Sequence, residues 1–117
     1  MTYTNMLATV AAVITIGFGL FGALCPNRVA SFVGLSPLGG LGISEIRATY
    51  GGLFMALGFA CLHLQSPDAY FVAGAAWCGA AAMRLPSLVF DADSFPKAVG
   101  GAVVEAGIGL MLFSGAR

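Results

Sequence analysis

Four apolar stretches, each close to the length of a helix that crosses a lipid bilayer, constrain the fold of this chain most. They cover residues 6–25, 43–64, 69–90 and 96–113. A membrane-spanning helix needs about 20 mainly apolar residues to cross about 30 Å of hydrocarbon. Hydrophobic residues make up 59% of the chain and charged residues 9%, whereas soluble domains carry about 25% charged residues. The sequence therefore predicts an all-α polytopic membrane protein, a four-transmembrane-helix bundle that occupies residues 1–117 as a single domain.

Short breaks separate these predicted spans. Pro26 interrupts the chain after the first, Pro67 lies in the break after the second, and Asp91 begins a polar turn after the third. Pro96 suits the first turn of the fourth helix, where its missing N–H costs nothing. The first stretch is expected to remain as a span, because no Lys or Arg precedes it and its 20 residues exceed the core of a signal peptide. An even number of spans places both termini on one side, and the positive-inside rule favours cytoplasmic connections.

The connection between the first two spans is predicted to hold a short interfacial helix at residues 28–35. Its apolar residues Val29, Phe32 and Val33 share one face at helical spacing. The glycine-rich stretch 39–42 is then expected to give a flexible entry into the second span.

Four charged residues lie inside the predicted spans and are the first candidates for a functional site: Glu45, Arg47, Arg84 and Glu105. A charge at the middle of a bilayer costs about 3 kcal/mol on insertion scales, so such residues pair, line a wet cavity or bind a ligand. We expect the two acids and two bases to form a neutral cluster that lies toward one membrane face. Arg84 is expected to contact Glu105 or Glu45, because a charge buried alone costs several kcal/mol.

The positions of these residues along each helix leave two interpretations open. Glu45 and Arg47 lie about 200° apart around an α-helix and should not pair with each other. Tyr50 falls on the face of Arg47 and completes the candidate ligand-binding cluster. The structural alternative is that Glu45, Arg47 and Arg84 reach headgroups from helix ends, and that Glu105 only forms an ion pair between helices.

The remaining reactive residues form no recognisable catalytic or metal-binding pattern. Cys25, Cys61 and Cys78 have no short spacing, and His63 is the only histidine. We therefore expect no catalytic residue, no metal and no cofactor. A net charge of zero without a basic tract also argues against nucleic-acid binding.

The segment Ser-Glu-Ile-Arg-Ala-Thr-Tyr-Gly-Gly-Leu at 44–53 resembles a signature of small four-helix bacterial membrane proteins related to the DoxX-like group. The later pattern, Arg84 followed by an acidic turn and then Glu105, is similar to that family as well. The family commonly has Gly before this arginine, where this chain has Met83. The resemblance covers essentially the whole chain and implies a four-helix protein of the bacterial inner membrane. It brings no assigned activity, only a loose link to redox or stress physiology.

Two functions from different classes follow from these observations. The first is a binding protein whose polar cluster holds a small molecule or a lipid, with transport as one use of such a site. The second is an accessory subunit whose Gly- and Ala-rich helix faces dock onto a larger membrane complex. An enzyme ranks third. The expected partners are membrane lipid and either further copies of the chain or a larger membrane complex.

Overall fold

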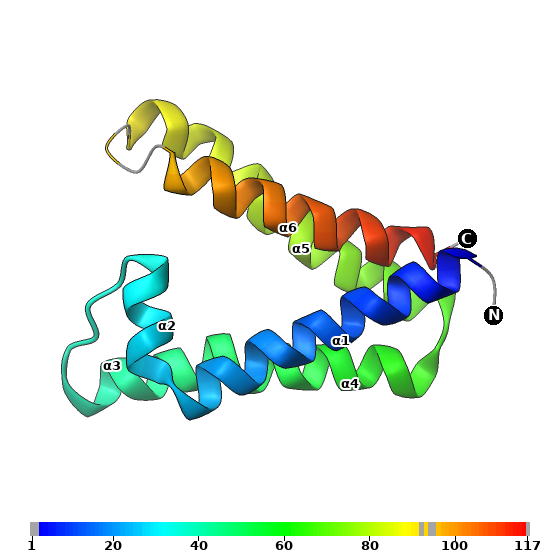
Figure 1. The fold of residues 1–117 in the computed structure, drawn as a ribbon, viewed down its shortest axis with the longest axis horizontal. Coiled ribbons are helices and arrows are strands. Elements are labelled where there is room, and N and C mark those ends of the chain that lie inside the picture. The colour runs from blue at the N-terminus through cyan, green and yellow to red at the C-terminus, as the bar shows by residue number, and fades with distance from the viewer. Residues whose placement is uncertain (1–2, 92, 94–95, 117) are drawn as a thin grey trace. The chain divides into compact units, whose positions relative to one another are not determined.

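The computed structural model describes residues 3–91, 93 and 96–116, and these residues form helices joined by short connections (Figure 1). The part of the chain that it describes contains no strand. Three helices within it are long and apolar enough to cross a membrane: Asn5–Leu24, Pro67–Phe90 and Lys97–Ser114. The all-α prediction is confirmed, and a span of sufficient length is confirmed for three of the four predicted stretches.

A break and a short helix follow the first span as predicted, but the helix covers Pro26–Val33 instead of 28–35 and the break is at Cys25. Helix α1 (Tyr3–Leu24) ends one residue before Cys25, and helix α2 (Pro26–Val33) begins with its proline in the first turn. A proline is tolerated there because the N–H it lacks would have no partner within the helix. Gly34, with φ of 80°, ends α2 in the left-handed conformation, which glycine adopts without steric cost.

The second predicted span is a continuous helical run of three parts. It comprises α3 (Gly39–Ile46), the π-helical segment η1 (Arg47–Leu53) and α4 (Phe54–Leu64). The residues at both junctions, Ile46 and Phe54, keep right-handed helical dihedral angles. A π-helix bonds residue i to residue i+5 and is usually confined to a single turn inside an α-helix. Because η1 divides the run, α3 and α4 are each shorter than the three helices that are long enough to cross a membrane.

The glycine-rich stretch 39–42 is not a flexible entry, so that prediction was wrong. These residues form the first turn of α3, and the Gly42 N–H donates to the Leu38 carbonyl oxygen at 3.1 Å. Pro37 packs so closely on Gly42 that an added Cβ would lie 2.9 Å from the proline Cα. This close contact with Pro37, which only glycine permits at position 42, outweighs the low helix propensity of glycine.

The third and fourth predicted spans form as single helices, α5 (Pro67–Phe90) and α6 (Lys97–Ser114). The Ser66 hydroxyl accepts a hydrogen bond from the backbone N–H of Ala69 at 3.2 Å and so caps α5, as serine commonly does. Helix α5 continues through Pro86 near its end, at the cost of one backbone hydrogen bond.

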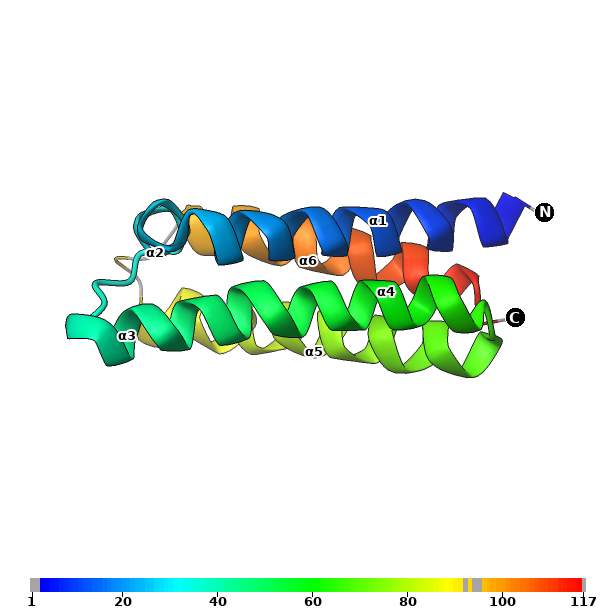
Figure 2. The ribbon, with the colours of Figure 1, turned by 90° about the horizontal axis from the view of Figure 1, so that it is seen from below.

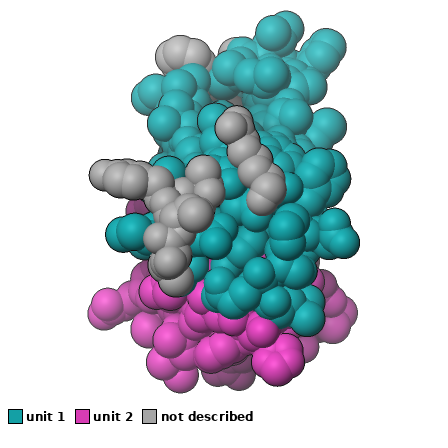
Figure 3. Space-filling view, turned by 90° about the vertical axis from the view of Figure 1, so that its right-hand side faces the viewer, with its two compact units in different colours: residues 1–11, 64–117 teal, residues 12–63 magenta. Residues whose placement is uncertain are grey.

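The chain packs as two compact units (Figure 3): residues 1–11 with 64–117 form unit 1, and residues 12–63 form unit 2. In unit 1, α5 and α6 lie antiparallel and side by side (Figure 1). A Cβ added to Gly74 would lie 3.0 Å from the Gly109 carbonyl oxygen. The ring centroids of Phe71 and Phe113 are 5.4 Å apart. Close approach at small residues is typical of helices that pack in lipid.

Unit 1 also brings together described residues near the two ends of the chain. A Cβ added to Gly115 would lie 2.5 Å from the Ala8 Cβ and 2.7 Å from the Tyr70 ring. Tyr70 is buried, and its hydroxyl donates to Gln65 Oε1 at 3.0 Å. The contact between Ala8 and Gly115 agrees with the predicted placement of both termini on one side.

In unit 2, the part of α1 after residue 11 packs along η1 and α4 (Figure 2). A Cβ added to Gly22 would overlap the Tyr50 carbonyl group, and one added to Gly58 would lie 2.7 Å from the Ala12 carbonyl oxygen. Gly51 and Gly58 are buried here, whereas Gly52 is exposed. Gly51 and Gly58 therefore pack against α1, whereas Gly52 does not.

Helix α2 packs on the start of the second helical run. Val29 and Ala30 are buried against Ile46, with Tyr50 packed at the edge of this core. Phe32 follows Val29 by one turn of α2, yet Phe32 is 71% exposed whereas Val29 is only 6% exposed. The predicted apolar face is therefore buried only in part.

The outer surface of the described chain is strongly apolar. Many large apolar side chains are more than half exposed, among them Leu24, Leu38, Leu41, Val89 and Phe90. Apolar patches of this extent are rare on soluble monomers and mark contact with lipid or with another protein. The surface agrees with the three candidate spans.

Candidate functional site

Arg84 on α5 and Glu105 on α6 form an ion pair with two hydrogen bonds. Arg84 Nε donates to Glu105 Oε1 at 2.8 Å, and Arg84 Nη2 donates to Glu105 Oε2 at 3.2 Å. Paired bonds of this kind between a guanidinium and a carboxylate are among the stronger hydrogen bonds in proteins. The predicted contact of Arg84 is confirmed, and Glu105 is its partner.

The antiparallel arrangement of α5 and α6 explains why these two residues meet. Arg84 lies near the end of α5, and Glu105 lies in the first half of α6, so both are close to the turn that joins the helices. Ala81 and Trp77, one and two turns before Arg84, are buried on the same face of α5. The pair therefore fixes the register of α5 against α6.

Gly101 makes room for the guanidinium group. It lies one turn before Glu105, and a Cβ added to it would be 3.3 Å from both Cζ and Nε of Arg84. A larger side chain would press on the plane of the guanidinium and disturb its two bonds. Gly101 belongs to the site, although the sequence analysis did not single it out.

The chain alone does not bury its charges. The side chain of Arg84 is 41% exposed and that of Glu105 is 15% exposed. Glu45 and Arg47 are exposed, and no charged residue whose exposure is described is buried. Within unit 1 the pair is therefore only partly covered by protein.

The other three candidate residues belong to unit 2. Glu45 lies in the last turn of α3, and Arg47 begins η1. In the described part of the chain, the side chain of neither residue makes a hydrogen bond or an ion pair. Tyr50 is half-buried in η1, and its ring meets that of Phe54 edge-on at 6.0 Å. The predicted cluster of all four charges stays a prediction.

The π-helical segment changes which residues share a face. The predicted faces of the second span assume α-helical spacing, but η1 adds a residue to its turn. Gly52 now lies beside the backbone of Arg47, five residues earlier, with an added Cβ 4.0 Å from the Arg47 carbonyl oxygen. The α-helical faces predicted beyond Arg47 are wrong for this reason. π-helical turns recur at functional sites, and this one contains Arg47 and Tyr50.

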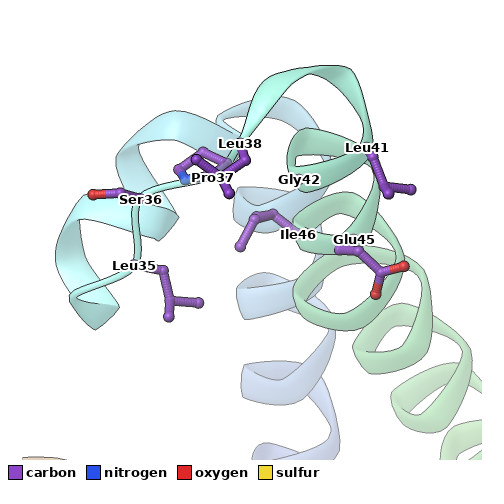
Figure 4. Close-up of a pocket in the computed structure, with 8 residues that line it drawn as sticks. All are labelled: Leu35, Ser36, Pro37, Leu38, Leu41, Gly42, Glu45 and Ile46. Carbon is purple, nitrogen blue, oxygen red and sulfur yellow. The ribbon is translucent and has the colours of Figure 1, made fainter.

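A shallow hollow opens beside α3 (Figure 4). Its volume is about 350 Å³. Its walls come from the connection after α2 and from one side of α3: Leu35, Ser36, Pro37, Leu38, Leu41, Gly42, Glu45 and Ile46. Ile46 extends from α3 on the side of the connection, whereas Glu45 and Leu41 extend together from the other side of α3 (Figure 4). The hollow was not predicted, because it depends on how the connection folds onto Gly42.

Comparison of the chain with models of protein families, with curated proteins and with solved structures gave no match. The resemblance to the DoxX-like group accordingly carries no support beyond the residues that suggested it.

Proposed function

We propose that this chain is a multi-pass protein of the bacterial inner membrane that binds a small molecule or a lipid through its charged residues. The proposal counts the helical run through α3, η1 and α4, which covers residues 39–64, as a membrane span in addition to the three candidate spans. The DoxX-like relation is part of the same proposal.

The ion pair between Arg84 and Glu105 is the observation that carries the proposal. Both residues lie within helices that are long and apolar enough to cross a membrane. Charged residues in such helices are rare, and they mark substrate pathways or sites that bind ligands and ions. The guanidinium group of Arg84 would hold an anionic or carbonyl-bearing group. Glu105 would orient Arg84 through its two hydrogen bonds.

A second candidate function, that of an accessory subunit, is favoured by the outer face of α5. Small residues are exposed along it, at Ala75, Ala76, Gly79, Ala80 and Ala82. A Cβ added to Gly79 would meet nothing within 4 Å. Such a face allows another helix to approach closely in lipid. Under this alternative the ion pair would only fix the register of α5 and α6.

Native mass spectrometry of the protein purified in a mild detergent tests the binding function. We expect the wild-type protein to retain a small molecule or lipid, and the Arg84→Gln variant to lose at least nine-tenths of that occupancy. Arg84→Lys keeps the charge but not the paired hydrogen bonds, and should retain an intermediate amount. Asp91→Asn, in the exposed turn after α5, is the control and should bind as the wild type does.

Two results would contradict the binding function. One is a protein that carries no small molecule or lipid but co-purifies with a stoichiometric partner subunit. The other is an occupancy that is equal in the wild type and in Arg84→Gln.

A further inference from the structure

The hollow beside α3 has two properties that together define a ligand class. The first is an apolar lining. Of its eight lining residues, only Ser36 and Glu45 have polar side chains. The volume of about 350 Å³ is at the lower end of the range for small-molecule sites. An apolar wall of this size suits an alkyl or aryl group.

The second property is a carboxylate at the edge. Glu45 is the only charged residue that lines the hollow. Within the described residues its carboxylate has no hydrogen-bond or ion-pair partner. Arg47 follows two residues later, on the far side of the helix, and does not line the hollow. A carboxylate beside apolar walls attracts a cation, since opposite charges interact strongly where water is scarce.

The hollow is also reached from an apolar exterior. Leu38 is 86% exposed and Leu41 is 76% exposed, and both residues line the hollow. If these leucines lie in lipid, a molecule that partitions into the membrane can enter without crossing water. Such a molecule must itself be largely apolar.

We propose that the hollow binds lipophilic cations, that is, compounds with an alkyl or aryl body and one delocalised or quaternary positive charge. The body lies against Leu38 and Leu41, and the charge lies beside the Glu45 carboxylate, which extends on the same side of α3 as Leu41 (Figure 4). The inference goes beyond the proposed function, because it adds a second site in unit 2. This site would bind a cation, whereas Arg84 would hold an anionic or carbonyl-bearing group.

Equilibrium binding of tetraphenylphosphonium to the protein in nanodiscs of zwitterionic lipid tests this site. We expect saturable binding of one cation per chain, weakened at least tenfold in Glu45→Gln. Asp68→Asn removes an exposed carboxylate at the start of α5 and should bind as the wild type does. Leu41→Arg places a positive charge in the hollow and should also weaken binding at least tenfold.

Tetraphenylborate is the matched probe, since it has the same four phenyl groups and the opposite charge. It should not displace bound tetraphenylphosphonium from the wild-type protein. Displacement by the borate, no saturable binding of the cation, or equal binding by wild type, Glu45→Gln and Leu41→Arg would each overturn the inference. Each variant is first compared with the wild type by circular dichroism and size-exclusion chromatography, so that loss of fold is not read as loss of binding.

Failure here is distinct from failure of the proposed function. If tetraphenylphosphonium does not bind but a co-purified molecule is lost in Arg84→Gln, only the inference about the hollow is wrong. If the cation binds at Glu45 and no molecule depends on Arg84, the inference stands and the proposed role of Arg84 is wrong.

Discussion

Replacing Glu105 with glutamine should lower the free energy of unfolding in a lipid bilayer by about 3 kcal/mol. Glutamine preserves the shape of the side chain but removes its charge, so the Arg84 guanidinium loses the carboxylate with which it pairs. In lipid no water can solvate that charge, which is why the loss exceeds the 0–1 kcal/mol expected of a pair exposed to water. Steric trapping in bicelles can measure the difference.

The control for this substitution is Asp91→Asn, because Asp91 lies in an exposed turn and should change stability by less than about 0.5 kcal/mol. A double-mutant cycle with Arg84→Met and Glu105→Gln isolates the interaction itself. The double variant should lose less free energy of unfolding than the sum of the losses in the two single variants. Simple additivity, or equal effects of Glu105→Gln and Asp91→Asn, would show that the pair contributes nothing to holding α5 on α6.

Replacing Gly22 with alanine should destabilise the protein by about 1–3 kcal/mol, the usual effect of overpacking. The added methyl group would overlap the Tyr50 carbonyl group in η1, so α1 would have to move away from the π-helical turn. The melting temperature in detergent, followed by circular dichroism, should fall accordingly.

Gly17→Ala is the matched control, since both glycines lie on α1 and a Cβ at position 17 would meet nothing within 4 Å. Alanine has a higher helix propensity than glycine by about 1 kcal/mol, so this variant should be as stable as the wild type or slightly more stable. If Gly22→Ala matched Gly17→Ala, the close packing of α1 on η1 would be wrong.

The breaks between the helices could be predicted approximately because proline acts locally. Pro26 and Pro67, which were predicted to lie in the breaks, instead occupy the first turns of α2 and α5, a position that proline tolerates. The π-helical turn could not be predicted. It adds one residue to the turn without any change in composition, and the sequence 47–53 reads equally well as part of an α-helix.

The candidate site was predictable where few partners were available. With only two acids and two bases in the predicted spans, Arg84 had two possible acidic partners, and the antiparallel packing of α5 and α6 selects Glu105. The role of Gly101 could not be seen, because it depends on which side of α6 the guanidinium approaches. The hollow at Glu45 depends on the path of the connection over Gly42, which no sequence period encodes.

The central claim is that the ion pair lies within the hydrocarbon layer, and the quenching of a tryptophan beside Arg84 tests it most directly. Met83 is 70% exposed on α5, so Met83→Trp in a Trp77→Phe background would report the surroundings of the pair. In bilayers whose acyl chains carry bromine, we predict strong quenching of this tryptophan by the lipid and little quenching by iodide in the water. Strong quenching by iodide together with weak quenching by brominated lipid would place the pair in water and contradict the account.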